Sequence, residues 1–556
     1  MAAVNITMSP SLRSRLVFLL CALAFAVFAR AADYQTEVLA QGSPLRGAQG
    51  LAFGPDGSLY VGCIAGQTIY RIDIVSGAVE NVVAAPLGGA DDLAVAADGT
   101  IVWTAIGDSA VRIRHPDGRI EDLAQGLVGV NGINFGPDGR LFATQLLPPS
   151  KLFEIDLDGV RPPKFVMEVP GSLNGFEIDA DYQLYGPLSQ NGTVVQIDLR
   201  TRQTIVIGEG MVTPISVNLS PDNSVVVLGY STGKVLRLDP NTGKHELIVQ
   251  LEGPIDNHAI AENGLIYVSR FADGQIVEID PITAAVRVVV PGNFTGPGGL
   301  SIVTIDGKEQ LLVADLTGNR FVDLQSGAVT RVQNFATSLS RLQRAYMGGT
   351  SVAITDDKLY STNAMTNAVH VFDLETGKPE HTFKNVFGPY DIAVLVSGDV
   401  IVAEFSMGRL LRFSRSADGK PRKKLLAKGL KGPVGVAVLG TTDVLVTETY
   451  TGALSRVSLA DGSVTRLIED LDQPEGLAVT QDGKVVVAEV GAKRLIQFDL
   501  QSGTTEILVD DLPIGATLWR TPAPAFLLTD VVIDRNGNLY VTADGTNDVL
   551  KISRVD

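Results

Sequence analysis

The chain has 556 residues, of which 45% are hydrophobic and 19% charged, and it contains 58 glycines and 27 prolines. This length exceeds the size at which one hydrophobic core stops growing, so two domains are expected. The formal net charge of −17 argues against binding to nucleic acid or to an anionic membrane. The composition is typical of short buried strands joined by tight turns, and it excludes a disordered chain.

The first residues have the pattern of a secretory signal peptide. Two arginines precede the apolar run Leu16–Ala29, and small residues mark a cleavage site near Ala31. We therefore expect residues 1–31 to be removed and the protein to be exported, as a periplasmic or secreted protein. Removal takes away three arginines and no acidic residue, so the net charge changes from −17 to −20. Of the two cysteines only Cys63 remains, which excludes an intrachain disulfide.

A unit of roughly 42 residues recurs along the rest of the chain. Gly50–Val61, Gly132–Ala143 and Gly476–Val487 share a pattern of strand, Asp-Gly turn and strand. The Asp-Gly pairs supply the positive φ that a tight hairpin needs. Two further strands follow each pair, so the unit predicts a four-stranded antiparallel blade of a β-propeller. The position of Gly50 recurs at Asp92, Gly132, Gly175, Ser216, Asn257, Gly299, Ser351, Asp391, Gly435, Gly476 and Asp530.

Twelve blades in one ring would leave a wide hole, so we expect an all-β fold of two tandem six-bladed β-propellers. A division into five and seven blades is the alternative. The mature chain begins with an outer strand at Thr36–Ala40 and ends with a third strand at Val549–Val555. We therefore expect each ring to donate its first strand to its last blade, with Val286–Val290 opening the second ring. The expected divisions are a signal peptide at 1–31, a first propeller at 32–283 and a second at 284–556.

The residue just before each Gly50-type position is expected to point into the mouth of the central channel. In the first propeller these residues are Gln49, Asp91, Asn131, Asn174, Ile215 and Asp256. All but the isoleucine carry side-chain oxygens, and oxygens converging on one axis would suit Ca²⁺. Alternatively, these side chains cap the backbone of the inner strands and bind water.

The repeat resembles the SMP-30/gluconolactonase and paraoxonase superfamily of six-bladed propellers and, more loosely, NHL-type repeats. Asn131 and Asn174, each followed by glycine, match the family's Asn-Gly ligand motifs, and Asp256-Asn257 is similar to the Asp-Asn of the paraoxonases. The sequence departs from the family at Gln49, where the family has glutamate. The resemblance implies Ca²⁺, or another divalent cation, held by Gln49, Asp91, Asn131, Asn174, Asp256 and Asn257.

The same resemblance implies hydrolysis of a small lactone or ester, with the metal polarising the carbonyl group. Asp256, Asp91 or His258 would then activate water. Strand alternation places His258 on the same side as Asp256, facing the channel, unless it is a structural hydrogen-bonded group. A lyase or isomerase on the same cage, and a non-catalytic scaffold for a protein or glycan, are the alternatives.

The ends of the second strands are expected to rim the pocket of the first propeller and to contact the small-molecule substrate. The candidates are Cys63, Gln145, Tyr230 and Arg270. Arg270 would bind a carboxylate or a developing anion, or would instead pair with Asp256 or Asp91.

The second propeller differs, because Glu475 is the one carboxylate at its channel-mouth positions. We therefore do not expect the same metal site there. Its second strands end in Asp315, Asn363, Glu404, Glu448, Glu489 and Asp544. We expect these side chains to brace neighbouring turns rather than to bind a cation. Two insertions, Asn334–Met347 with helical spacing and the apolar Pro513–Ala525, are candidate lids or packing segments, and a protein or glycan could bind this half.

Overall fold

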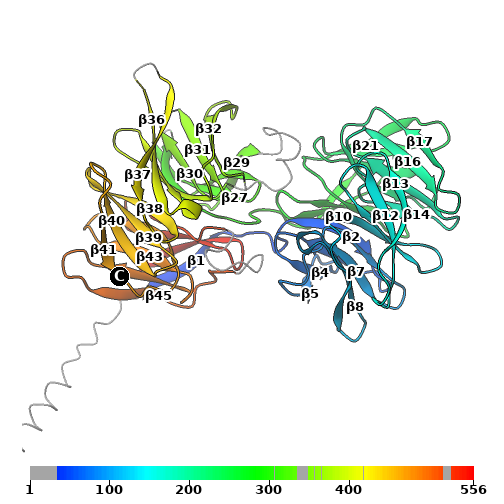
Figure 1. The fold of residues 1–556 in the computed structure, drawn as a ribbon, viewed down its shortest axis with the longest axis horizontal. Helices are drawn as coiled ribbons and strands as arrows, with labels where there is room; N and C mark the ends of the chain where they lie inside the picture. Colours follow the sequence, from blue (N-terminus) through cyan, green and yellow to red (C-terminus); the bar gives the residue numbers. More distant parts are fainter. Residues whose placement is uncertain are drawn as a thin grey trace, which may run out of the picture.

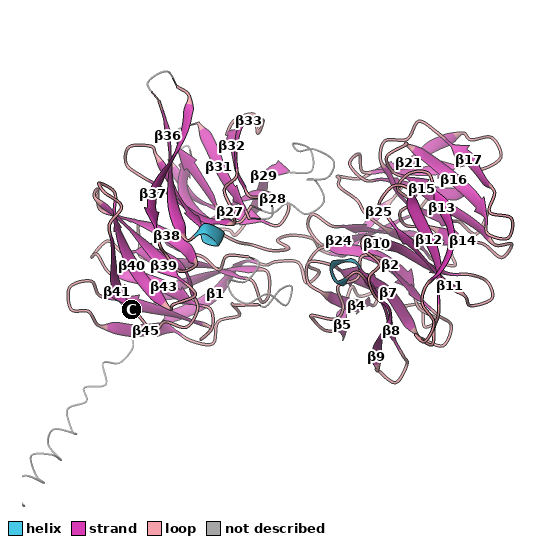
Figure 2. Cartoon of the chain, viewed as in Figure 1, coloured by secondary structure: helices cyan, strands magenta, loops and turns pink. Residues whose placement is uncertain are grey.

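The computed structural model describes residues 34–555 apart from 306, 335–348, 356, 365, 417–418 and 517–526. Within these ranges the chain forms 48 strands and two short 3-10 helices, η1 (Ile106–Asp108) and η2 (Phe405–Met407). The strands form twelve four-stranded sheets, which are arranged as two rings joined side by side (Figure 1). Almost no helix is present in either ring (Figure 2). The prediction of an all-β fold with two tandem six-bladed propellers is confirmed.

The first propeller contains six sheets, each made from four consecutive strands. Blades 1 and 2 are β2 (Ala48–Phe53), β3 (Leu59–Cys63), β4 (Thr68–Ile72) and β5 (Val79–Val83), then β6 (Leu93–Val95), β7 (Ile101–Ala105), β8 (Ala110–Arg114) and β9 (Ile120–Ala124). Blades 3 and 4 are β10 (Val130–Phe135), β11 (Leu141–Gln145), β12 (Ser150–Ile155) and β13 (Lys164–Val169), then β14 (Glu177–Ile178), β15 (Gln183–Leu188), β16 (Thr193–Asp198) and β17 (Thr204–Gly208). Blades 5 and 6 are β18 (Pro214–Leu219), β19 (Val225–Gly229), β20 (Lys234–Leu238) and β21 (His245–Gln250), then β22 (His258–Ile260), β23 (Ile266–Arg270), β24 (Gln275–Ile279) and β25 (Val286–Val290).

The second propeller contains the other six sheets. Its blades 1 and 2 are β26 (Leu300–Ile305), β27 (Lys308–Asp315), β28 (Gly318–Asp323) and β29 (Val329–Asn334), then β30 (Val352–Thr355), β31 (Lys358–Asn363), β32 (Ala368–Asp373) and β33 (Pro379–Lys384). Blades 3 and 4 are β34 (Pro389–Val394), β35 (Val400–Glu404), β36 (Arg409–Arg415) and β37 (Pro421–Lys428), then β38 (Pro433–Leu439), β39 (Asp443–Glu448), β40 (Ala453–Ser458) and β41 (Val464–Ile468). Blades 5 and 6 are β42 (Pro474–Val479), β43 (Val485–Glu489), β44 (Arg494–Phe498) and β45 (Thr505–Val509), then β46 (Val531–Ile533), β47 (Leu539–Ala543), β48 (Asp548–Arg554) and, from the other end of the chain, β1 (Tyr34–Ala40).

Asp-Gly turns set the pairing of the first two strands in a blade. In blade 1 the backbone N–H of Ser58 donates to Asp56 Oδ1 at 3.1 Å, and Gly57 between them has a φ of 76°. A positive φ of this size costs a residue with a Cβ atom about 1 kcal/mol or more, so glycine fits this position. The turn therefore joins β2 and β3 without strain.

The core lies between neighbouring blades and is built mainly by the second strands. All five residues of β7 are buried, including Trp103, whose indole N–H donates to the carbonyl oxygen of Leu87 at 3.2 Å. A strand that is covered on both faces is mostly apolar, and Thr104 is the one polar residue of β7. Each buried valine, leucine or isoleucine contributes about 1.5–3 kcal/mol, so blade-to-blade packing can hold the fold without a disulfide.

The last blade of the second propeller is completed by the N-terminal strand. β1 pairs antiparallel with β48, with Tyr34 opposite Arg554 and Thr36 opposite Ile552. β25 instead pairs with β24 and completes the sixth blade of the first propeller. The prediction that each ring donates its own first strand, with Val286–Val290 opening the second ring, is therefore wrong.

The physical reason for this closure is the number of strands available to each ring. The first propeller has six complete blades without a donated strand, so only the last blade of the second propeller lacks an outer strand. Pairing with β1 covers the open edge of β48. The first propeller is thus inserted between β1 and the rest of the second, and the sheets divide after Val290 rather than at 283.

The two propellers contact each other through turns that follow their second strands and through the segment that joins β1 to β2. Arg46 donates through Nε to Asn547 Oδ1 at 2.7 Å and through Nη2 to the carbonyl oxygen of Asp544. Thr317 Oγ1 donates to the carbonyl oxygen of Ala272 at 2.7 Å. An apolar group packs beside these bonds, made of Ile64, Ala65, Phe271 and Leu316. The mouth faces of the two propellers therefore adjoin at one edge.

Several predicted segments lie outside the described residues. These are the signal peptide at 1–31, nearly all of the insertion Asn334–Met347 and most of Pro513–Ala525. Among the residues that are described, no helix has the length and hydropathy needed to span a bilayer.

Candidate functional site

The six predicted channel-mouth residues of the first propeller meet in one cavity of about 300 Å³, here called the mouth chamber. They are Gln49, Asp91, Asn131, Asn174, Ile215 and Asp256. The register of an inner strand shifts at its start, for example between Ala48 and Leu51 in β2 and between Val130 and Ile133 in β10. Such a bulge changes the direction of the side chains that lie before the regular strand pairing. The mouth residue is one of these, and its side chain therefore points toward the channel.

Hydroxyl groups on the second strands fix the backbone of two mouth residues. Thr104 Oγ1 in blade 2 donates to the carbonyl oxygen of Asn131 in blade 3 at 2.6 Å. Ser269 Oγ in blade 6 donates to the carbonyl oxygen of Gln49 in blade 1 at 2.7 Å. Each bond ties an inner strand to the neighbouring blade, so both mouth residues are held before any ligand binds.

Two amide oxygens in the mouth chamber are buried without a hydrogen-bond partner in the described structure. They are Gln49 Oε1 and Asn131 Oδ1, in side chains that are only 6% and 5% exposed. The Asn131 nitrogen donates to Asp91 Oδ2, and this bond directs the oxygen away from Asp91. An unsatisfied buried acceptor costs about 1–3 kcal/mol, so two of them in one cavity indicate a site for a ligand with positive charge or hydrogen-bond donors.

Asp256 adds a carboxylate to the same chamber. In the described part of the chain its side chain makes no hydrogen bond or ion pair, and burial raises its pKa to about 7. Asn174 differs, because its Oδ1 already accepts the backbone N–H of Gly175 at 2.8 Å. A carbonyl-type oxygen has a second lone pair, so Asn174 can still bind a ligand.

An apolar wall covers one side of the mouth chamber. Leu146, Leu147 and Pro148 follow β11, and Tyr230 follows β19. Sequence reasoning placed the rim at the last residue of each second strand, whereas these lining residues come after the strand. Tyr230 was predicted at the rim and does line the chamber. The available signal for this wall was the apolar run Leu146–Pro148, since this loop has the same four-residue length as the corresponding loops of the other blades.

The other predicted rim residues do not line the mouth chamber, so this part of the prediction is wrong. Cys63 is fully buried in the core between blades 1 and 6, and burial raises the pKa of its thiol to about 12. The Gln145 amide nitrogen donates to the carbonyl oxygen of Val128 at 2.9 Å. Arg270 forms an ion pair with Asp273 at 2.7 Å, so its charge is already compensated.

Asn257 lies at the waist of the channel, where it and Asp92 are shared by the mouth chamber and a second cavity. Its Nδ2 donates to Asp92 Oδ1 at 2.9 Å, and its Oδ1 accepts from Ser216 Oγ at 2.7 Å and from the backbone N–H of His258 at 2.8 Å. Both ends of the amide are therefore engaged. This arrangement argues against the predicted role of Asn257 as a metal ligand.

His258 does not share the mouth chamber with Asp256. Its ring is 1% exposed, and its Nδ1 lies 2.9 Å from Ser216 Oγ in the neighbouring blade. Burial lowers its pKa to about 3, so the ring is neutral at pH 7 and a weak proton acceptor. Strand alternation failed here because β22 begins only at His258, after the irregular stretch that carries Asp256.

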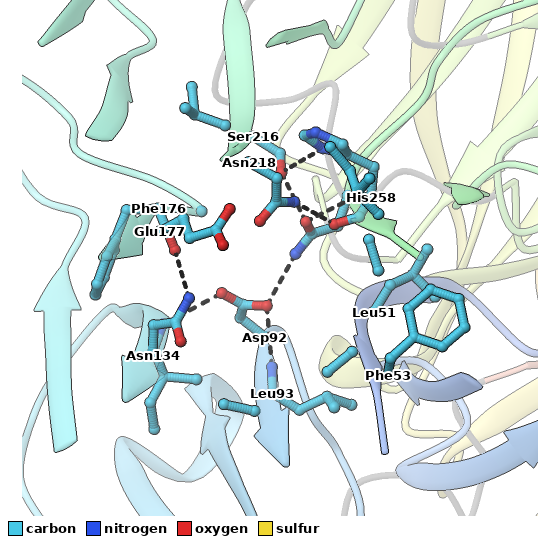
Figure 3. Close-up of a pocket in the computed structure, with 18 of the residues that line it drawn as sticks. Leu51, Phe53, Asp92, Leu93, Asn134, Phe176, Glu177, Ser216, Asn218 and His258 are labelled. Carbon is cyan, nitrogen blue, oxygen red and sulfur yellow. Dashed lines mark hydrogen bonds between the residues drawn. The ribbon is translucent and has the colours of Figure 1, made fainter. Parts of the chain in front are cut away.

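The second cavity, here called the far chamber, lies at the opposite end of the same channel and measures about 270 Å³ (Figure 3). Asp92, Asn134, Glu177 and Asn218 give it a polar surface. The backbone N–H of Leu219 donates to Glu177 Oε2, and burial raises the pKa of this carboxyl to about 7. Sequence reasoning considered only the mouth and missed this chamber. The sequence signal for this chamber was a polar residue two positions after each of Gly132, Gly175 and Ser216, namely Asn134, Glu177 and Asn218.

The acidic ends of the second strands in the second propeller brace turns, as predicted. Asp315 Oδ1 accepts the backbone N–H groups of Thr295 and Gly296 at 3.1 and 2.9 Å. Glu489 likewise accepts the N–H of Asp472 at 2.8 Å and pairs with Arg494 at 2.6 Å. Across the described residues, no three histidine, cysteine, aspartate or glutamate side chains are arranged to hold a metal ion. A metal site among these described residues would therefore depend on amide oxygens.

Comparison with known proteins places a family resemblance in the second half of the chain. A protein-family model described as the SMP-30/Gluconolactonase/LRE-like region matches residues 321–555. A search of curated proteins gave no match. Two similar solved structures are a streptogramin B lyase (17% identity, TM-score 0.37) and a virginiamycin B lyase from Staphylococcus aureus (14%, TM-score 0.37). Each comparison covers 51% of this chain and 96% of the other. The chain is thus a tandem six-bladed propeller protein whose second propeller is similar to the SMP-30/gluconolactonase family, although the motifs that suggested this family lie in the first.

Proposed function

We propose that the first propeller binds a divalent cation in the mouth chamber and hydrolyses a small lactone or ester there. The supporting observation is the pair of unpartnered buried oxygens, Gln49 Oε1 and Asn131 Oδ1, in a cavity that also contains the Asp256 carboxylate. Ca²⁺ takes about six to eight oxygen ligands from carboxylates, amides and water. Such an ion would satisfy both orphaned acceptors at once.

The donor set fits this ion. Gln49, Asn131 and Asp256 would hold it, with Asn174 as a further amide ligand. The carboxylates of Asp256 and Asp91 match the charge of a divalent cation. The third lining carboxylate, Asp92, is hydrogen-bonded to Asn257 at the waist, and no lysine, arginine or histidine is among the lining residues. The proposed set therefore keeps four of the six predicted ligands, gives Asp91 the role of orienting Asn131, and leaves out Asn257, whose amide is engaged at the waist.

When bound, a divalent cation polarises a carbonyl oxygen and makes water more acidic. The chain's own residues have separate tasks. Asp91 holds the Asn131 amide in the orientation that presents its oxygen. Leu146–Pro148 and Tyr230 pack against the apolar part of the substrate and exclude water from the reacting group. A chamber carboxylate, Asp256 or Asp91, accepts the proton from the attacking water.

The family resemblance supports a hydrolase of this type only in general terms, because the matched region is the second propeller. The choice of the first propeller depends on its mouth residues. The same donor set would also serve a lyase or an isomerase, and identification of the product would separate these reactions. For a hydrolase the ring opens with uptake of one water molecule.

The test is hydrolysis of a panel of neutral lactones and aryl esters by the mature protein, with and without a chelator. We expect activity that chelation abolishes and added Ca²⁺ restores. Asp256→Ala should lower the rate by about 100-fold or more, as is common when a group that stabilises the transition state is lost. Asp239→Ala is the matched control, because Asp239 is an exposed turn residue of the same propeller. Activity that survives the chelator or Asp256→Ala would contradict the proposal.

A further inference from the structure

The far chamber is a second polar cavity that the proposed hydrolase does not use. It is separated from the mouth chamber by the waist, where Asn257 is hydrogen-bonded to Asp92. Figure 3 shows the side chains of Asp92, Glu177 and Asn218 approaching one central space. These residues come from blades 2, 4 and 5, so the cavity is built by the ring as a whole and not by one loop.

The lining of the far chamber contains acidic side chains but no basic side chain that is charged at neutral pH. The ionisable residues among the lining are Asp92, Glu177 and His258, and no lysine or arginine is included. The pKa of His258 is lowered to about 3 by burial, so its ring brings no positive charge at neutral pH. Asp179 lies close enough to Glu177 to raise its pKa further by repulsion. A positive ligand would therefore relieve an electrostatic penalty that no positively charged residue of the described lining compensates.

Glu177 has an oxygen available for such a ligand. Its Oε2 accepts the backbone N–H of Leu219, while its Oε1 makes no hydrogen bond to a described residue. Asn218 donates through its nitrogen to the carbonyl oxygen of His258, which leaves its own Oδ1 as an acceptor. A carboxylate oxygen and an amide oxygen thus line the same space as acceptors without protein donors.

Aromatic rings contribute the remaining surface. Phe53, Phe135 and Phe176 line the far chamber, with Phe53 and Phe176 on opposite sides in Figure 3. Phe53 is partly exposed, whereas Phe176 is 3% exposed and its ring packs in the core between blades 3 and 4, where a Cβ atom added at Gly132 would be 2.9 Å from its Cδ1. Aromatic faces attract cations, and the attraction reaches about 2 kcal/mol when the cation is desolvated.

We propose that the far chamber binds a small organic ammonium ion, with the ammonium group on Glu177 and Asn218 and its alkyl part against Phe53 and the other apolar side chains of the lining. An ammonium group offers three hydrogen-bond donors and a single positive charge, which matches one carboxylate and the nearby amide oxygens. A divalent metal fits less well, since it would need more oxygen ligands than this set supplies. A cavity of about 270 Å³ has room for a short alkyl amine. This assignment does not depend on the chemistry of the mouth chamber.

Binding should depend on pH through Glu177. The pKa of this carboxyl is raised to about 7 by burial, so it is largely protonated in the empty chamber at pH 6. Pairing with an ammonium ion requires the ionised form, so affinity should rise as the pH increases from 6 to 8. Asp92, Asp179 and His258 are the other titratable groups that face it.

The experiment uses butylammonium chloride as the probe on the full mature protein, observed by ligand saturation-transfer NMR. Two control compounds have alkyl chains of similar length to that of butylammonium: 1-butanol is neutral and butyrate is an anion. We expect butylammonium alone to bind, with a dissociation constant on the order of 1 mM. Glu177→Gln should weaken its binding by about tenfold or more, since it removes the charge but keeps the shape. Asp256→Asn, in the mouth chamber, should leave it unchanged.

Four outcomes would overturn the assignment. They are no saturation transfer to butylammonium, equal transfer to 1-butanol, binding that Glu177→Gln leaves intact, and binding that Asp256→Asn removes. Thermal unfolding of each variant shows whether it is folded. If Glu177→Gln is not folded, Asn218→Leu replaces it, because this change removes the acceptor oxygen and should also weaken binding. Failure of this test leaves the metal site untouched, since the metal content of the mouth chamber is measured separately.

Discussion

Asn131 donates a hydrogen bond from its side-chain nitrogen to the Asp91 carboxylate, and this contact decides which end of the amide faces the mouth chamber. The two residues are the mouth positions of neighbouring blades, so the bond also links the inner ends of blades 2 and 3. The oxygen that remains, Asn131 Oδ1, is buried without a partner. A cation or a hydrogen-bond donor bound in the mouth chamber would give Asn131 Oδ1 the partner that it lacks.

Asp91→Ala tests the orienting role of this bond. Without the carboxylate the Asn131 amide is free to rotate, and one negative charge is lost from the chamber. We expect the affinity for a divalent cation, measured by isothermal titration calorimetry, to fall by about tenfold or more. Asp98→Ala is the matched control, because Asp98 is an exposed turn residue of the same blade. An unchanged affinity in Asp91→Ala would show that the pair does not act on a metal.

Deletion of the residues up to Ala40 tests the closure of the second propeller. The deletion leaves the outer edge of β48 unpaired along its whole length. We expect the second propeller to lose about 3 kcal/mol or more, since several strand hydrogen bonds of about 1 kcal/mol each disappear. Scanning calorimetry should show a lower melting temperature. A peptide with the sequence of β1 should restore it and a scrambled peptide should not; an unaltered transition would exclude this pairing.

The Cys63 thiol should be inert in the folded protein. It is fully buried in the core between blades 1 and 6, and its raised pKa of about 12 leaves almost no thiolate at pH 8. We expect iodoacetamide to label it only after unfolding in guanidinium, as measured by intact mass. Rapid labelling of the native protein would mean that this thiol is accessible, contrary to its position in the core.

Glu177 should make stability depend on pH. Its folded pKa of about 7 lies above the ordinary value of 4.5, so the folded state binds more protons between these values. The stabilisation is therefore fully present below about pH 4.5 and is lost as the pH rises through 7. We expect urea unfolding to show that Glu177→Gln reduces this loss by about 1–3 kcal/mol. An identical pH dependence in the variant and the parent would contradict the raised pKa.

The mouth chamber could be predicted from the sequence because its residues occupy one position of a regular repeat. Once Gly50 and its equivalents were aligned, the residue before each was expected at the channel, and all six are there. The repeat does not predict which side chains pair with one another. Arg270 pairs with Asp273, three residues on, rather than with a chamber carboxylate, and nothing in the repeat distinguishes these partners.

Two further differences have physical causes that one sequence does not reveal. β1 and β25 are outer strands of similar pattern, and either can cover an open strand edge; the linkers and the ring geometry decide which one does. His258 was expected at the channel because strand alternation was extended back to Asp256. The regular strand starts only at His258, and the bulged entry of the chain changes the phase.

The metal content of the purified protein tests the central proposal most directly. Elemental analysis by mass spectrometry, after dialysis against buffer with Ca²⁺, should find one divalent ion per chain. Asp256→Ala and Asn131→Ala should each lose it, while Asp239→Ala should retain it. A parent protein with no stoichiometric divalent ion, or one whose ion survives both mouth-chamber substitutions, would contradict a metal site built from Gln49, Asn131 and Asp256.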